Sequence, residues 1–131
     1  MEQRCLWPEP NDAGSGSVTF VNRFTLSGSA EDFEAAFAET AEFLCRRPGF
    51  RWHVLLAPTG SGSADVRPQY VNIAVWDDEA SFRAAVAHPQ FPAHAAVLRA
   101  LSTSEPTLYR SRQIRVAPGA PAMSRPEGRT T

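Results

Sequence analysis

"YVNIAVW", residues 70–76, decides the fold of this chain of 131 residues. Aromatic and β-branched residues dominate it, and both alternating sets of side chains are largely apolar. This pattern predicts a strand over 69–76 that is buried on both faces. Asn72 stands at its centre, where a buried amide without a partner costs about 1–3 kcal/mol. We therefore expect Asn72 to hydrogen-bond another part of the protein, a trapped water or a bound molecule.

Three further segments are typical of strands. Residues 18–26, "VTFVNRFTL", and 50–56, "FRWHVLL", are rich in β-branched and aromatic residues. Residues 107–116, "TLYRSRQIRV", follow a break at "TSEP" and form the last predicted strand. A flexible connection joins the second strand to 69–76.

The helices complete the order of elements. Apolar residues at helical spacing predict helices over about 29–47 and 78–101, the second interrupted by Pro89 and Pro92. The order β-α-β-β-α-β predicts an α+β, ferredoxin-like fold, a four-stranded antiparallel sheet with both helices on one face. We expect the first and third strands to be its central pair and to run parallel to each other.

One face of this sheet lacks a cover, because two helices on one side leave the other side open. Val71, Ile73 and Val75 point to that side, together with Val21 of the first strand. A continuous apolar stripe on a sheet predicts a partner surface. We therefore expect a homodimer with two-fold symmetry in which the sheets pack face to face, as in a dimeric α+β barrel.

Composition limits the domain and its partners. Pro, Gly and polar residues predict flexible tails over 1–17 and 117–131, which leaves one folded domain over 18–116. The net charge of −1 does not favour nucleic acid, and the sequence shows no secretory signal and no apolar run that could span a membrane. Cys5 and Cys45 form no recognisable framework, so we expect a cytoplasmic location.

The predicted helix-side face carries polar groups. Asn22 and Asn72 lie on adjacent strands, and Trp76 follows four residues after Asn72 on the same face. Two amides and an indole N–H would line an apolar chamber, although the two amides could instead bond each other within a plain core. Seven aromatic residues are candidates for the substrate-binding wall: Phe20, Phe24, Phe33, Phe37, Tyr70, Phe82 and Phe91.

A proton acceptor for such a chamber is less clearly marked. His94 falls on the inward arc of the second helix and is the best candidate base, although it could also be a partly exposed residue after the proline break. His88 precedes Pro89 and is typical of a local cap. The face to which His53 points is undecided, and an acidic substrate could lose its proton to water.

Several motifs resemble those of a known family. "VNRF", "PGF", "YVNIAVWDDEASFRAAVAHPQFPAH" and the closing "LY" are similar to the antibiotic biosynthesis monooxygenase family over about 18–112. In its branch that oxidises aromatic polyketides without a cofactor, the functional positions correspond to Asn22, Asn72 and Trp76. Some members use a tyrosine six residues after the tryptophan, where this chain has Phe82.

The resemblance implies an enzyme that uses O2 to oxidise an anthrone-like polyketide ring to a quinone, as a homodimer and without a cofactor. Two alternatives stay open. One is a haem-degrading relative with His94 as iron ligand, although the tryptophan of that branch is Ala85 here. The other is a non-oxidative cyclase or binding protein on the same fold. Nucleotide-binding and H-E-x-x-H motifs are absent, and the three histidines are dispersed, so no metal site is predicted.

Overall fold

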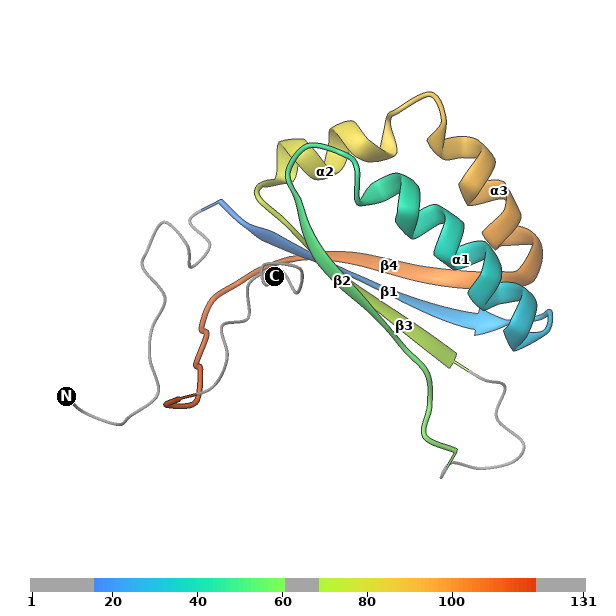
Figure 1. The fold of residues 1–131 in the computed structure, drawn as a ribbon, viewed down its shortest axis with the longest axis horizontal. Helices are drawn as coiled ribbons and strands as arrows, with labels where there is room; N and C mark the ends of the chain where they lie inside the picture. Colours follow the sequence, from blue (N-terminus) through green and yellow to red (C-terminus); the bar gives the residue numbers. More distant parts are fainter. Residues whose placement is uncertain (1–15, 61–68, 120–131) are drawn as a thin grey trace.

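The computed structural model describes residues 16–60 and 69–119, which form a four-stranded sheet in the order β2-β3-β1-β4. Figure 1 shows the helices together on one face of this sheet. The elements are β1 (Val18–Leu26), α1 (Ala30–Leu44), β2 (Phe50–Leu56), β3 (Gln69–Trp76), α2 (Glu79–Val86), α3 (Phe91–Leu101) and β4 (Ser102–Arg110). The predicted ferredoxin-like α+β fold is confirmed.

The strand directions correct one expectation. β1 and β3 are the central pair, but they run antiparallel, as do β1 with β4 and β2 with β3. Helix α1 carries the chain from β1 to β2, which therefore runs parallel to β1 one position away. β3 follows β2 in the opposite direction and fills the gap between the two, so it is antiparallel to both.

The second half of the chain differs in its boundaries. The predicted second helix is two helices, α2 and α3, separated at the first proline. His88 lies in this turn and accepts a hydrogen bond from the backbone N–H of Gln90 at 3.0 Å, which confirms the predicted local cap. β4 begins at Ser102, well before the predicted strand 107–116, and ends at Arg110.

A proline explains the misplaced start of β4. Pro106 makes residues 102–110 unlike a strand in sequence. However, β4 lies at the edge of the sheet, where a residue without an N–H is tolerated. Residues 111–119 contain only an isolated bridge at Val116. Most of the two predicted tails, over 1–15 and 120–131, lies outside the described residues, as does 61–68 of the predicted flexible connection.

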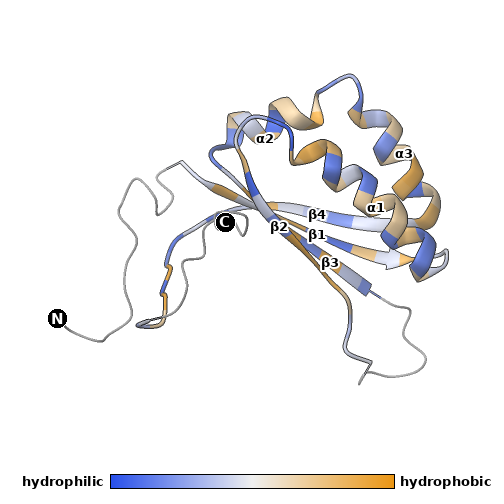
Figure 2. Cartoon of the chain, viewed as in Figure 1, coloured by the Kyte–Doolittle hydropathy of each residue, from blue (hydrophilic) through white to orange (hydrophobic). Residues whose placement is uncertain are grey.

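The first helix follows its sequence pattern closely. Ser29 caps α1 by accepting a hydrogen bond from the backbone N–H of Asp32 at 3.0 Å. Phe33, Phe37 and Thr40 of the predicted inward stripe are buried. Apolar residues lie along the strands as well as on the helices (Figure 2). Within the described ranges, no helix has the length and apolar character needed to cross a membrane.

The core between sheet and helices is divided into two clusters of buried residues. One cluster contains Phe24, Leu26, Phe33, Phe37, Tyr70 and Leu98. The other contains Val18, Ala74, Trp76 and Ala85, with Phe20, Phe50, Phe82 and Leu108 packed against it. Asn22 and Asn72 occupy the strand positions between these clusters, so polar groups interrupt the core at the middle of the sheet.

Candidate active site

The two asparagines face each other across the central strand pair. Asn22 of β1 and Asn72 of β3 are partners in the antiparallel register. Asn72 is 5% exposed and belongs to the same buried set as Tyr70, Ala74 and Trp76. The alternation of side chains therefore brings both amides to the helix-side face, as the sequence predicted.

Asn72 has a side-chain partner. Its Oδ1 lies 3.0 Å from Nδ1 of His53 on β2, in a partly buried position. An amide oxygen can only accept, so the Nδ1 of His53 donates in this pair. The imidazole therefore answers the question raised by an asparagine at the centre of a buried strand.

Asn22 is in a different state. Its Oδ1 is buried and has no hydrogen-bond partner among the described residues. A buried polar atom in this state costs about 1–3 kcal/mol. In either orientation of the amide, Oδ1 or Nδ2 occupies this buried position, and a bound molecule could form a hydrogen bond with it.

A β-bulge decides which β2 side chains reach this face. Phe50 pairs with Trp76 and Trp52 pairs with the adjacent Val75, so Arg51 is an extra residue on β2. Such a bulge shifts the alternation of a strand by one position. Simple alternation assigns Phe50 and His53 to opposite faces. Because the bulge lies between them, they share one face.

His53 reaches the helix-side face through this shift. Its ring centroid lies 6.2 Å from that of Phe50 and 5.9 Å from that of Phe37. It is half-buried and opposite Ala74 in the register, next to Asn72. Strict alternation from the start of the strand gave no sign of the extra residue, so the sequence left this histidine unplaced.

Trp76 stands at one end of the polar row, within the second core cluster. It is 1% exposed, and its ring packs 5.1 Å from Phe50 and 6.0 Å from Phe82, measured between centroids. Phe20 lies 4.8 Å from Phe82. Two of the predicted aromatic side chains, Phe20 and Phe82, thus gather with the tryptophan, and Phe50 joins them.

The opposite wall is more closely packed. Centroid distances of 5.1–5.8 Å link the rings of the first cluster, namely Phe24, Phe33, Phe37 and Tyr70. The Tyr70 hydroxyl donates to Oε2 of Glu34 at 2.5 Å. This hydrogen bond, together with burial and the charge of the carboxylate, raises the pKa of Tyr70, so its hydroxyl stays a neutral donor.

Two predicted residues lie elsewhere in the helix layer. The ring of His94 stacks on Phe43 of α1 with centroids 5.1 Å apart, and Phe91 lies 6.5 Å from the same ring. No interaction joins His94 to either asparagine or to Trp76 within the part of the chain that the structure describes. The histidine that the structure brings to the asparagines is His53.

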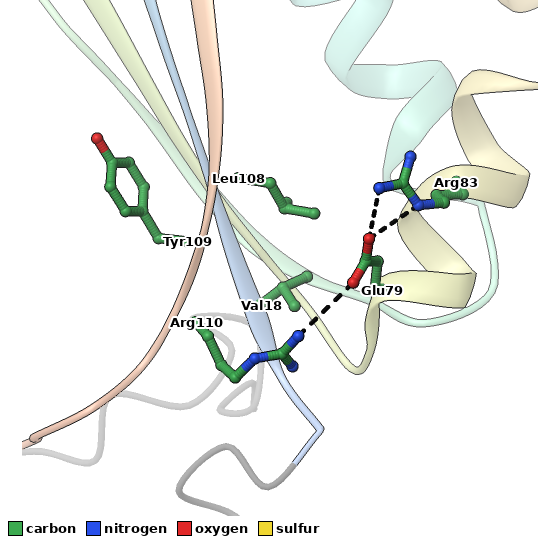
Figure 3. A pocket seen from close by; sticks show the side chains of 6 residues that line it. All are labelled: Val18, Glu79, Arg83, Leu108, Tyr109 and Arg110. Carbon is green, nitrogen blue, oxygen red and sulfur yellow. Dashed lines mark hydrogen bonds and ion pairs between the residues drawn. The ribbon is translucent and has the colours of Figure 1, made fainter.

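Two surface hollows lie beside these walls, and the predicted site residues line neither of them. The larger, about 410 Å³, lies where α2 faces the turn at Arg47 and Pro48. The smaller, about 280 Å³, lies between α2 and the end of β4 (Figure 3). It is lined by Val18, Glu79, Arg83, Leu108, Tyr109 and Arg110. Its floor of Val18 and Leu108 also packs in the cluster that contains Trp76.

Comparison with known proteins shows which family this arrangement belongs to. The sequence profile of the antibiotic biosynthesis monooxygenase family matches residues 17–97. This chain belongs to that family. It is accordingly an oxidoreductase that uses O2, and the matched range includes both asparagines, Trp76 and His53.

Relatives within the antibiotic biosynthesis monooxygenase family are similar over most of their length. Deoxynogalonate monooxygenase from Streptomyces nogalater is 53% identical over 96 residues, which is 73% of this chain and 77% of that protein. The crystal structure of SnoaB, a cofactor-independent oxygenase from the same organism, has a TM-score of 0.68 and 51% identity. The match covers 76% of this chain and 97% of SnoaB.

A more distant structure resembles only the fold. It is a dimeric ferredoxin-like protein of unknown function from Thermobifida fusca YX, with a TM-score of 0.60 and 15% identity. The match covers 72% of this chain and 91% of that protein.

Proposed function

We propose that this monooxygenase oxidises an anthrone-like ring of an aromatic polyketide to a quinone with O2 and without a cofactor. The names of its relatives, a deoxynogalonate monooxygenase and a cofactor-independent oxygenase, support this reaction class. The observation that carries the proposal is Oδ1 of Asn22, which is buried opposite Asn72 and has no hydrogen-bond partner among the described residues. A phenol or hydroperoxide O–H would satisfy this atom by donating to it, and with the amide reversed its N–H would donate to an oxyanion.

The substrate can supply the electrons for this reaction. Loss of a proton from the ring CH2 gives a carbanion conjugated with phenolic oxygens, which can pass one electron to O2. The radical pair combines to a peroxide, which eliminates water as the new C=O forms. Overall, the CH2 group and O2 become C=O and H2O, so one oxygen atom enters the product and the other leaves in water.

The protein needs to hold the ring, stabilise the anion and exclude bulk water. Neutral amide and indole N–H groups do this in a layer where a charge would be costly to bury. We assign Asn22 and Asn72 to the oxyanion or peroxide, and Trp76 to orientation of the ring. Because position 82 is a phenylalanine, no phenol at that place can transfer a proton.

His53 takes the role of general base that the sequence had assigned to His94. Nδ1 of His53 donates to Asn72, so Nε2 carries the lone pair in the neutral ring and can accept the substrate proton. The same contact holds the imidazole in one orientation. His94, stacked on Phe43, then serves the packing of the helix layer.

The aromatic side chains supply the walls for the ring. Phe20 and Phe82 lie at the Trp76 end and are the side chains we expect to contact it most closely. The remaining predicted wall residues, Phe24, Phe33, Phe37 and Tyr70, close the other end. Phe91 lies near Phe43 and supports the wall indirectly.

We also propose that the protein works as a two-fold homodimer formed by the open faces of the sheets. The helices cover only one face, and Val54 and Leu56 on the other are 37% and 43% exposed. The register places them in one apolar surface, the open-face patch, composed of Val21, Trp52, Val54, Leu56, Val71, Ile73 and Val75. A patch of this kind favours a second copy over solvent.

Oxygen uptake tests the proposed reaction. With flavin and metals removed, the enzyme should consume O2 and form the quinone from a dihydroxyanthrone. Asn72→Ala should lower kcat by about 100- to 1000-fold, the loss typical of a donor aimed at a developing oxyanion. Trp76→Phe should also lower the rate, because it removes the indole N–H and keeps an aromatic ring.

Gln69→Ala is the matched control, since Gln69 is an exposed residue of the same strand. Unchanged rates in both Asn72→Ala and Trp76→Phe would contradict the site assignment. A polyketide product formed without O2 uptake would favour the cyclase alternative.

A further inference from the structure

The 280 Å³ hollow contains a carboxylate held between two guanidinium groups. Figure 3 shows Glu79 of α2 in the hollow, with Arg83 on one side and Arg110 of β4 on the other. Arg83 is bound tightly, because its Nε and Nη2 donate to Oε2 of Glu79 at 2.9 and 2.5 Å.

Arg110 is bound less well. Its Nη2 lies 3.7 Å from Oε1 of Glu79, beyond the length of a hydrogen bond. Its side chain is 57% exposed. A guanidinium carries five N–H donors in a planar fork, so the donors of Arg110 are available to a second acceptor at the hollow.

The strand register aligns Arg110 with the active site. Val18 is the partner of Trp76 on one side and of Arg110 on the other, so the three residues form one row across β3, β1 and β4. Directly opposite residues share a face, so Arg110 also projects to the helix side, as in Figure 3. Two strand spacings of about 4.8 Å separate Trp76 from Arg110 along this row.

The floor of the hollow connects Arg110 with the core cluster around Trp76. Val18 and Leu108 line it and also pack against the cluster around Trp76 and Phe82. A flat aromatic molecule bound at the Trp76 end of the core would therefore reach the hollow across Val18 and Leu108, and would meet Arg110 beside Glu79.

We infer that Arg110 binds a carboxylate of the polycyclic substrate, with Glu79 as the internal competitor for the same guanidinium. This inference rests on the proposed function, because it places the rest of the ring system at Trp76. A planar fork matches a planar carboxylate through paired, charge-assisted hydrogen bonds. The substrate class is thus an aromatic polyketide acid, and a neutral ester would lack this contact.

Binding of the quinone product in place of turnover tests this assignment. An anthraquinone carboxylate and its methyl ester are titrated by calorimetry into the wild type, Arg110→Gln, Glu79→Gln and Arg99→Gln. Arg99 is an exposed residue of α3 and provides the same loss of charge away from the hollow. We expect the acid to bind the wild type roughly tenfold more tightly than the ester, the difference that one charge-assisted contact produces.

Arg110→Gln should abolish this preference and leave the affinity of the ester unchanged, whereas Arg99→Gln should keep it. Glu79→Gln should strengthen binding of the acid, because it removes the competing carboxylate. Equal affinities for acid and ester in the wild type would overturn the inference, as would an equal loss for both in Arg110→Gln. Because no turnover is needed, these outcomes are independent of whether the protein consumes O2.

Discussion

Asn22, Asn72 and His53 bring neutral polar groups into a layer of aromatic side chains. Burial of an isolated charge there would be far more costly than burial of an amide. His53 satisfies Asn72 at 3.0 Å, while Oδ1 of Asn22 has no partner in the described part of the chain. This difference assigns distinct roles to the two amides. Asn72 is held in place, and we propose that Asn22 binds a substrate O–H through Oδ1 or, with the amide reversed, an oxyanion through Nδ2.

At the same scale, His53 variants separate proton transfer from positioning. His53→Gln keeps a side-chain N–H that can donate to Asn72 but cannot accept a proton from the substrate. We expect its kcat to fall about 100-fold or more, the usual contribution of a general base. In His53→Ala, added imidazole should restore part of the rate measured by oxygen uptake.

His94→Gln is the matched control and should keep nearly the full rate, because His94 stacks on Phe43. The assignment fails if His53→Gln is as active as the wild type, or if His94→Gln carries the loss.

Individual residues also show where prediction from the sequence succeeds. Period-two alternation placed Asn22, Asn72 and Trp76 on one buried face, because their strands are regular over these residues. It could not place His53, since the bulge at Arg51 shifts the alternation and no local signal marks the extra residue. Arg110 was missed because its alignment with Trp76 depends on the pairing of β4.

At the scale of elements, the turn before β2 and its bulge aim side chains at the site. Gly49 has a φ of 88°, and its carbonyl accepts a hydrogen bond from the backbone N–H of Asp77 at 2.7 Å. Nε of Arg51, the extra residue of the bulge, donates to Oδ1 of the same aspartate at 2.7 Å. These two contacts tie the start of β2 to the end of β3, which sets Phe50 against Trp76.

Gly49→Ala should therefore destabilise the fold by more than about 1 kcal/mol, because the backbone conformation disfavours a side chain. A Cβ at this position would also lie 2.3 Å from Oγ of Ser81. The free energy of unfolding in urea measures the effect. Gly60→Ala is the control, since Gly60 has a φ of 94° but no atom of the described residues beyond its chain neighbours within 4 Å of the added Cβ. An equal loss in both variants would show that the contact with Ser81 has no role.

Prediction of the elements was reliable where local signals and tertiary contacts agree. The cap at Ser29 and the apolar stripe of α1 fixed that helix from sequence. β4 was misplaced because its exposed, polar sequence with Pro106 lacks a strand pattern, and only pairing with β1 makes it a strand. The direction of the central pair likewise depends on the order of strands in space.

At the scale of the whole molecule, the helices cover one face of the sheet (Figure 1) and leave the open-face patch uncovered, where we propose that a second copy packs. Val54→Glu places a charge within this patch, opposite Ile73 in the register. Desolvating that charge in an interface would cost several kcal/mol, so we expect the variant to be a monomer at micromolar concentration. Light scattering coupled to size-exclusion chromatography gives the mass.

Val97→Glu is the control, because Val97 is 50% exposed on α3, away from the open face. It should keep the dimeric mass. A monomeric wild type, or a Val54→Glu variant with the mass of a dimer, would contradict the proposed assembly.

A crystal structure of the complex with a quinone product tests the central claim most directly, because it locates the group that completes the Asn22 amide. The account predicts an oxygen of the quinone about 2.7–3.2 Å from that amide, either a phenolic hydroxyl that donates to Oδ1 or a quinone oxygen that accepts from Nδ2, with the ring between Trp76 and Asn72. A structure in which backbone groups satisfy Asn22, with the quinone bound away from both asparagines, would contradict it.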